Sequence, residues 1–320
     1  MVHRKRNRFG DRTWARSLAK LGNMRKTPDH ADNLGILRSK LRDYYRLTKP
    51  EVNLLVLMAT SAGFYLGSPT PLRFIALIHT VLGTLLVASG TATLNQWMER
   101  VWDGRMRRTA KRPIPSGRVS AREAFVFGGL LSIGGGLYLA LTVNVLSSLL
   151  ATSTLLSYLL VYTPLKRKTP LCTLLGAIPG AMPTLIGWTA ATDRIDAQAW
   201  FLFAILFLWQ FPHFLAIALM YREDYARAGY HMLPQFDRHS RFTRAEIVGF
   251  AVVLVVTTML PARTRSAPAY FAVMALAGVF LLHHVVKVAR SASPALASRL
   301  LYASVLYLPV ILGTLVALKQ

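Results

Sequence analysis

Residues 72–94 read LRFIALIHTVLGTLLVASGTATL and continue without a break into NQWMERVWD at 95–103. The first part consists mostly of apolar and small residues, and it is about as long as the roughly 20 residues that a helix needs to cross a bilayer. The second part places amide, acidic and aromatic side chains directly after that run. This stretch therefore predicts a membrane-spanning helix and places candidate functional side chains at its end.

Similar apolar runs fill most of the chain. Of its 320 residues 53% are apolar and only 16% are charged, whereas soluble domains carry about 25% charged residues. We therefore expect an all-α, polytopic membrane protein with nine transmembrane helices in a bundle. The two shortest runs, at 52–67 and 246–262, are expected to extend further. The nine runs are 52–67, 72–94, 124–142, 145–163, 171–191, 199–221, 246–262, 268–288 and 299–318.

The basic residues predict the orientation of these spans. The chain has 38 Lys and Arg against 14 Asp and Glu, a formal charge of +24. With nine spans and the N-terminus in the cytoplasm, 33 of the 38 basic residues fall on the cytoplasmic side and five outside. The positive-inside rule favours this arrangement, with the C-terminus outside. It also accounts for the charge without nucleic acid as a partner. The five outside residues are Arg73, Arg194, Arg263, Arg265 and Lys319.

The first 48 residues differ from the rest and are expected to form a basic cytoplasmic tail that contacts anionic lipid head groups, followed by a nine-helix membrane domain at 49–320. The tail lacks the apolar core of a secretory signal. An organelle transit peptide is the alternative, but the tail contains four aspartates, at positions 11, 29, 32 and 43. We therefore expect a bacterial inner (plasma) membrane. One cysteine, Cys172, rules out a disulfide within the chain.

Asn95, Glu99 and Asp103 are each four residues apart. Each step of four along a helix drifts only about 40°, so the three side chains share one face. Their oxygens are hard ligands of the kind that Mg²⁺ takes, together with substrate phosphates. The alternative is a solvated helix end with salt bridges.

Basic residues accompany this row. Arg107 and Arg108 follow the second apolar run, and Lys166 and Arg167 follow the fourth, next to Tyr162. Arg and Lys beside metal-binding acids suit the remaining charge of a diphosphate. Alone, the second group would be an ordinary positive-inside loop with interfacial tyrosines.

The sixth run ends with a second acidic pair, Glu223 and Asp224. Adjacent residues point about 100° apart, whereas Tyr221 and Asp224 share a face, so Asp224 is the better candidate ligand. His213 lies eight residues earlier, about 12 Å deeper in the membrane. An ionisable residue at that depth is a candidate functional residue, and a histidine satisfied by a neighbouring helix is its alternative.

The second, fourth and sixth spans all end on the cytoplasmic side in this topology. We expect these ends to converge on a central intramembrane cavity that opens to the cytoplasm. Helix C-termini favour cations, and such a cavity suits a lipid-like substrate with a phosphate head. Transporters also place polar residues in membranes, but typically near the midplane and with internal repeats.

Several motifs together resemble the UbiA superfamily of intramembrane prenyltransferases, and within it the protohaem IX farnesyltransferases. The resemblance covers roughly residues 44–318. The matching motifs are YRLTKP at 45–50, NQWME at 95–99, RRT at 107–109, RPIPSG at 112–117, YTPLKR at 162–167, WQFPHF at 209–214, YREDY at 221–225, Gly229 and MLP at 232–234.

The resemblance implies transfer of a farnesyl group from farnesyl diphosphate to a vinyl group of haem b, with water, to give haem O and diphosphate. It implies Mg²⁺ as cofactor and a downstream haem-modifying membrane enzyme as a partner. A quinone precursor such as 4-hydroxybenzoate is the alternative acceptor, and a non-catalytic transporter or haem-binding protein is the alternative of another class. One departure is that Glu223 and Asp224 are adjacent rather than well spaced. The implied catalytic residues are Asn95, Glu99, Asp103 and Asp224; the metal ligands are these four and Glu223; the substrate-binding residues are Arg107, Arg108, Lys166, Arg167, Tyr162, His213 and Tyr221.

Overall fold

The computed structural model describes residues 30–260 and 267–319. The chain divides into two units, residues 1–43 and 44–320. The first unit is described only as the beginning of a helix, α2. Of the basic tail expected at residues 1–48, residues 1–29 lie outside the described residues, as do Arg263 and Arg265. The elements are α2 (His30–Leu47), α3 (Pro50–Gly67), α4 (Phe74–Asp103), α5 (Ala121–Thr142), α6 (Val145–Leu156), the π-helix η1 (Ser157–Tyr162), α7 (Thr163–Leu165), α8 (Cys172–Thr192), α9 (Ala197–Met220), α10 (Arg222–Ala228), α11 (Leu233–Phe236), α12 (Arg241–Met259), α13 (Ala267–Arg290) and α14 (Pro294–Ala317).

The described residues are helical with no strand, which confirms the all-α prediction. Eight of their helices are long and apolar enough to cross a membrane, the continuous segment Val145–Leu165 counting as one. The ninth expected run, 52–67, is helix α3, which has 18 residues but is not among the eight. Glu51 and Asn53 in its first turns lower its apolarity. The structure thus confirms a multi-helix membrane protein and does not confirm the number nine.

Helix starts follow from local capping. Ser120 accepts a hydrogen bond from the Glu123 N–H, and the Glu123 carboxylate accepts one from the Ser120 N–H, which is a capping box before α5. Three further helices begin with a single N-cap hydrogen bond, in which a side-chain oxygen accepts from a backbone N–H of the first turn. The capping residues are Asn144 for α6, Asp196 for α9 and Ser293 for α14. The spans are therefore delimited by polar residues between the apolar runs.

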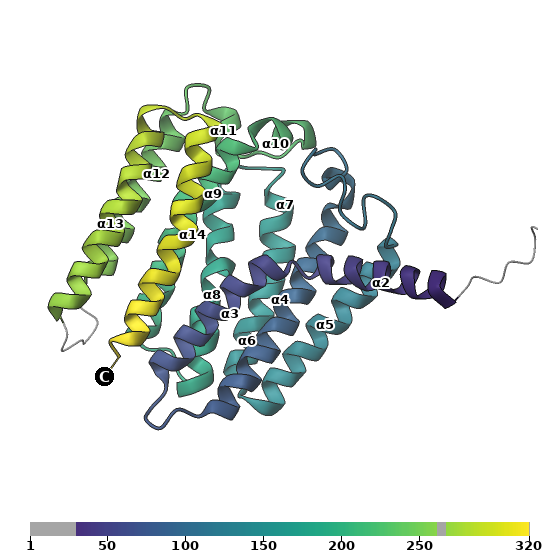
Figure 1. Cartoon of the computed structure of the whole chain (residues 1–320), viewed down its shortest axis with the longest axis horizontal. Coiled ribbons are helices and arrows are strands. Elements are labelled where there is room, and N and C mark those ends of the chain that lie inside the picture. The colour runs from purple at the N-terminus through teal and green to yellow at the C-terminus, as the bar shows by residue number, and fades with distance from the viewer. Residues whose placement is uncertain (1–29, 261–266, 320) are drawn as a thin grey trace, which may run out of the picture. The chain divides into compact units, whose positions relative to one another are not determined.

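The helices of residues 44–319 form a closed bundle (Figure 1). Neighbours in sequence pack together from α3 through α4, α5 and α6 to α8 and α9, and α9 then contacts both α12 and α14. The bundle closes because α14 also contacts α3. The ends of α4, α7 and α9 lie on the same side of the bundle, beside α10 and α11 (Figure 1).

Small residues allow α3 and α8 to pack closely. A Cβ added at Gly187 would overlap the Thr60 carbonyl oxygen, and one added at Gly63 would overlap the Thr184 carbonyl oxygen. Membrane helices associate through such small-residue contacts, because lipid supplies no hydrophobic drive between them. This crossing fixes α3, and with it Lys49, against the centre of the bundle.

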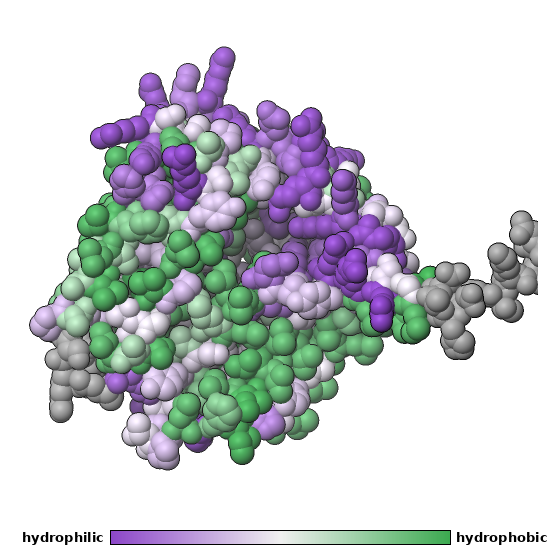
Figure 2. Space-filling view, viewed as in Figure 1, coloured by the Kyte–Doolittle hydropathy of each residue, from purple (hydrophilic) through white to green (hydrophobic). Residues whose placement is uncertain are grey.

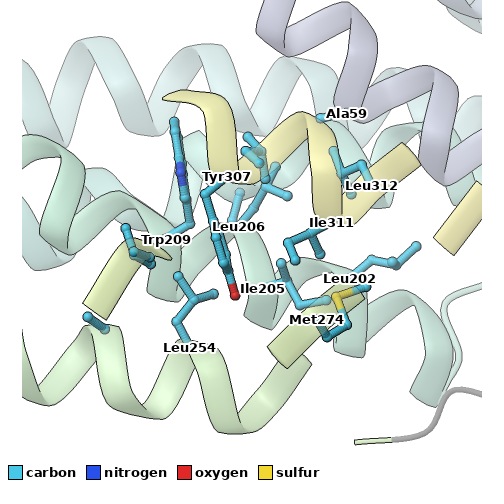
Figure 3. Close-up of a cluster of buried hydrophobic side chains, with 14 of the residues drawn as sticks. Ala59, Leu202, Ile205, Leu206, Trp209, Leu254, Met274, Tyr307, Ile311 and Leu312 are labelled. Atoms are coloured by element: carbon cyan, nitrogen blue, oxygen red, sulfur yellow. The ribbon is translucent and has the colours of Figure 1, made fainter. Parts of the chain in front are cut away.

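The main apolar core lies between α3, α8, α9, α12, α13 and α14. Leu202, Leu206 and Trp209 of α9 belong to one buried cluster with Leu254 of α12, Met274 of α13 and Tyr307 of α14 (Figure 3). Within this core Trp209 Nε1 donates a hydrogen bond to the Ser304 carbonyl oxygen at 2.7 Å. The core holds α9 in place and so positions the helix end that carries Asp224.

The surface separates polar and apolar side chains. Hydrophilic residues gather at the end that carries α10 and α11, and hydrophobic ones cover the helices below (Figure 2). Exposed leucines such as Leu130, Leu141 and Leu276 lie on these helices, each more than two-thirds accessible. A surface of that kind suits lipid contact.

Candidate functional site

The predicted polar row lies on one face of the last three turns of α4. Asn95, Glu99 and Asp103 are all buried, with exposed fractions of 1%, 6% and 0%. A solvated helix end would leave these side chains exposed, so the burial contradicts that alternative. Each residue of the row contacts a side chain from a different part of the chain, and at two of the three that contact is an ion pair.

Asn95 joins α4 to two other segments. Its Oδ1 accepts a hydrogen bond from Lys49 Nζ at 3.2 Å, and its Nδ2 donates to Thr163 Oγ1 at 3.1 Å. Lys49 precedes Pro50 and has φ 51°, a conformation rarely adopted by a residue before proline. Burial and then the positive charge of Arg112 lower the pKa of Lys49 to about 7.

Glu99 forms a buried ion pair with Lys166. Lys166 Nζ lies 2.8 Å from Glu99 Oε1. Burial lowers the pKa of Lys166, but the Glu99 carboxylate more than compensates and holds this pKa well above its usual value. The lysine ammonium also lies 4.4 Å from the centre of the Tyr162 ring, a cation–π contact.

The π-helix η1 determines where the Lys166 side chain lies relative to α4. Its wider turn lets the Thr163 hydroxyl donate to the Tyr158 carbonyl oxygen, five residues back, at 2.8 Å. Short π-helical segments are frequent at functional sites. Here the segment brings Thr163 to Asn95 and Lys166 to Glu99, so that α7 faces the row on α4.

Asp103 pairs with a residue that the sequence analysis did not select. Arg112 Nη1 lies 2.6 Å from Asp103 Oδ2. The other carboxylate oxygen, Oδ1, is buried and has no hydrogen-bond partner within the described part of the chain. An unsatisfied buried acceptor is costly, so this oxygen is suited to a ligand.

Asp224 is held by the loop that follows α4. Its Oδ2 accepts from the Arg108 N–H at 3.2 Å, and its Oδ1 is bonded by the Arg227 guanidinium. Burial raises the pKa of Asp224, but these two hydrogen bonds outweigh burial and place the pKa below its usual value. The second acidic group therefore lies beside the first through residues 104–112.

Two arginines stack on aromatic rings at the same end of the bundle. The Arg167 guanidinium lies 3.8 Å from the centre of the Trp102 ring, and that of Arg108 lies 4.8 Å from the centre of the Tyr221 ring. Both guanidiniums are on exposed residues, and a guanidinium that stacks by its face can still direct N–H groups to a phosphate.

A cavity of about 250 Å³ opens here. It lies at the end of α4, and side chains of both signs line it. The lining includes Trp97, Glu99, Trp102, Thr163, Arg167 and Tyr230. The ends of the second and fourth spans and Tyr230, in the loop after the sixth, therefore line one cavity, whereas Tyr221, Glu223 and Asp224 are not among its lining residues.

Three predicted residues lie apart from these contacts. His213 Nδ1 lies 2.9 Å from Ser304 Oγ of α14, and its ring stacks on Trp209. Arg107 and Glu223 are exposed. Their roles toward haem, diphosphate and metal stay predictions.

The residues fit Mg²⁺ in donor chemistry. In residues 30–260 and 267–319, no group of three or more His, Cys, Asp or Glu side chains is arranged to hold a metal ion. Mg²⁺, however, is usually held by one or two carboxylates together with substrate phosphates. Glu99, Asp103 and the Asn95 amide supply such a set, and Asp103 Oδ1 is unpartnered.

Comparison with known proteins identifies the family. The family model described as "UbiA prenyltransferase family" matches residues 56–306. The chain belongs to the UbiA prenyltransferase family. It is therefore a membrane prenyltransferase, and the transporter alternative is excluded.

Two similar proteins of known name carry the same name. "Protoheme IX farnesyltransferase" of Solibacter usitatus is 47% identical, covering 85% of this chain and 97% of its own. The protein of that name from Koribacter versatilis is 43% identical, covering 87% and 93%. These relatives favour a haem acceptor over a quinone precursor.

Solved structures show the same fold. A digeranylgeranylglyceryl phosphate synthase structure has a TM-score of 0.70 at 16% identity, over 88% of this chain and 99% of the other. A UbiA homolog from Archaeoglobus fulgidus, described as bound to GPP and Mg2+, has a TM-score of 0.61 at 15% identity, over 85% and 99%.

Sequence reasoning missed Lys49, Arg112, Thr163 and Tyr230 as site residues. Lys49 and Arg112 lie within motifs that carry the family resemblance, which was the available signal. Nothing in their spacing showed which acid each would contact, because these pairs form between separate segments.

Proposed function

We propose that this UbiA-family enzyme transfers the farnesyl group of farnesyl diphosphate to a vinyl group of haem b. Carbon 1 of the farnesyl group leaves diphosphate and bonds to the vinyl carbon. Water adds to the resulting cation and loses a proton. The products are haem O and diphosphate, so atoms and charge balance. The names of the two relatives support this choice of donor and acceptor.

One observation carries the proposal: the buried row on α4 faces cations from three other segments. Lys49, Lys166 and Arg112 contact Asn95, Glu99 and Asp103 respectively. Alternating acids and bases around a cavity suit a metal–diphosphate complex, in which acids hold the metal and bases take the remaining charge. A substrate without a charged group would need neither the acidic nor the basic side chains.

Asn95, Glu99 and Asp103 are proposed to hold a first Mg²⁺, and Asp224 a second, with Tyr221 or Glu223 as further candidates. Bound Mg²⁺ acts as a Lewis acid that neutralises charge on the leaving diphosphate. The A. fulgidus structure described as bound to GPP and Mg2+ supports this choice of metal. The unpartnered Asp103 Oδ1 supports the position.

The chain's own cations are proposed to bind the leaving group. The Lys166 ammonium, 2.8 Å from Glu99, would bind the diphosphate, and the Glu99 carboxylate would hold the metal beside it. Arg167 keeps N–H groups free while its guanidinium face rests on Trp102. Preorganised donors of this kind stabilise charge that develops in the transition state. Arg107, Arg108 and Tyr162 are proposed to assist at the rim.

The apolar part of the bundle is proposed to receive the farnesyl tail and the haem. An allylic cation must be kept from water, which a membrane cavity does. His213 is proposed to lie near the haem, because it is the histidine of α9 below the acidic end. We place the enzyme in the bacterial inner membrane, N-terminus in the cytoplasm and C-terminus outside, where a haem-modifying enzyme takes up the product.

The proposal is tested with purified protein, farnesyl diphosphate and either haem b or 4-hydroxybenzoate, with Mg²⁺ or with EDTA. Mass spectrometry should find haem O only with haem b and Mg²⁺. Prenylation of the benzoate alone would overturn the haem assignment. Undiminished product with EDTA would overturn the metal assignment.

A further inference from the structure

Tyr230 has a buried hydroxyl that the reaction described above leaves unused. Its side chain is 2% exposed, and its hydroxyl makes no hydrogen bond of standard geometry among the described residues. The charged group that acts on this hydroxyl most strongly is the Glu99 carboxylate, one of the proposed metal ligands. Yet Tyr230 lines the cavity together with Glu99 and Arg167. A polar atom in this situation either costs stability or waits for a ligand.

The backbone places this residue firmly. Helix α10 ends at Ala228 and is capped by Gly229, whose φ of 71° is in the left-handed region. The Gly229 N–H donates to the Ala226 carbonyl oxygen and the Tyr230 N–H to the Tyr225 carbonyl oxygen, both at 3.0 Å. These two bonds form a Schellman motif, in which the residue after the glycine packs back on the helix. Tyr230 therefore turns inward.

The packing of the ring fixes its direction. Tyr230 meets the Tyr225 ring edge to face at a centroid distance of 5.9 Å and belongs to a buried cluster with Met106, Cys172 and Met232. The next residue, His231, donates its N–H to the Lys166 carbonyl oxygen at 2.6 Å. The loop is thus tied to the segment that carries the proposed phosphate clamp.

We propose that the Tyr230 hydroxyl donates a hydrogen bond to an oxygen of the diphosphate and is a catalytic residue of the transfer. This inference rests on the proposed function and adds a residue to it. The surroundings favour diphosphate over haem as the molecule that accepts this hydrogen bond, because Glu99, Lys166 and Arg167 are the groups proposed to bind metal and phosphate. A phenol is uncharged at neutral pH and can donate, and a donor to a charged oxygen is stronger than one to a neutral oxygen.

The test compares the wild type with Tyr230→Phe, which removes only the hydroxyl. Inorganic pyrophosphate is the probe, as an inhibitor and as a ligand. The inhibition constant of pyrophosphate should rise about tenfold or more, and kcat/KM for farnesyl diphosphate should fall by at least as much. The KM for haem b should stay unchanged. Tyr302→Phe, on an exposed residue of α14, should change none of these.

Stability separates a ligand contact from a structural one. Tyr230→Phe should leave the unfolding temperature of the ligand-free protein unchanged or higher, because an unpaired buried hydroxyl is removed. A lower unfolding temperature, or a pyrophosphate constant within twofold of the wild type, would overturn the inference. A wild type that binds pyrophosphate but makes no haem O would overturn the proposed function instead, and the pyrophosphate comparison would still decide the role of Tyr230.

Discussion

The carboxylate of Glu99 lies 2.8 Å from the ammonium of Lys166, although 67 residues separate the two along the chain. Both side chains are nearly inaccessible, with exposed fractions of 8% and 11%. A buried pair of this kind stabilises little by itself, but the loss of one partner leaves a charge without compensation. In the proposed function, the pair places a metal ligand beside a phosphate ligand.

Substitution of Glu99 alone should therefore destabilise the protein more than substitution of Glu99 and Lys166 together. Glu99→Gln should lower the free energy of unfolding by about 3 kcal/mol, because Lys166 is left buried and unpaired. The combined variant Glu99→Gln with Lys166→Met should recover most of that loss and remain inactive. Unfolding in detergent and product formation measure the two effects. Glu51→Gln, on an exposed carboxylate, is the control, and a double variant no more stable than the single would contradict the pairing.

The second acidic group gives a comparison between adjacent residues. Asp224 is buried and receives two hydrogen bonds, whereas Glu223 is exposed. Asp224→Asn should reduce Mg²⁺-dependent diphosphate release at least about 100-fold, in line with the loss of a group that stabilises transition-state charge. Glu223→Gln should have the smaller effect. Equal losses would show that the two acids act together as ligands.

Arg167 should not be replaceable by lysine. Its planar guanidinium stacks on Trp102 and can still direct N–H groups to a phosphate, which an ammonium cannot do. Arg167→Lys and Arg167→Ala should both raise the KM for farnesyl diphosphate, each by roughly tenfold. Full activity of the lysine variant would show that charge alone is needed. Lys168→Ala, on the exposed next residue, is the matched control.

Asp237 provides a pH-dependent test of the fold. Its two carboxylate oxygens accept from the Arg241 and Thr243 N–H groups at 2.9 and 2.8 Å, at the start of α12. Burial raises the pKa of Asp237, but these hydrogen bonds outweigh it and lower the pKa below its usual value. Asp237→Ala should cost about 1–2 kcal/mol at pH 7.

The sign of its pH dependence follows from the lowered pKa. The contribution of Asp237 is fully present above the unfolded pKa, about 4, and is lost as the pH falls through the folded pKa. The difference in unfolding free energy between the wild type and Asp237→Ala should therefore shrink below pH 4. A difference that grows on acidification would contradict this assignment.

Sequence reasoning reached the helices and the acidic row because both depend on local periodicity. Apolar runs of the length of a bilayer predict spans, and a spacing of four predicts that Asn95, Glu99 and Asp103 share a face. It selected Lys166 as a phosphate ligand but did not predict that Lys166 pairs with Glu99, and it did not select Lys49. Lys166 depends on the π-helical turn of η1, and Lys49 on a left-handed backbone before proline, and neither has a sequence signal as clear as spacing.

Two further features also needed the structure. His213 was selected as an ionisable residue within a span, and the structure shows its partner, Ser304, 91 residues away on α14. Tyr230 was not selected, because the Schellman motif at Gly229 turns it inward only in three dimensions. Helix α3 is less apolar than the eight candidate spans because its first turns carry Glu51 and Asn53. Asn53 hydrogen-bonds Ser89 of α4.

The central claim is that this chain makes haem O through the acids of α4. The most direct test extracts haems from cells that lack their own haem O synthase and express either the wild type or Asp103→Asn, and identifies them by mass spectrometry. The account predicts haem O with the wild type and only haem b with the variant, at equal levels of membrane-inserted protein. Haem O in equal amounts from both, or none from the wild type, would contradict it.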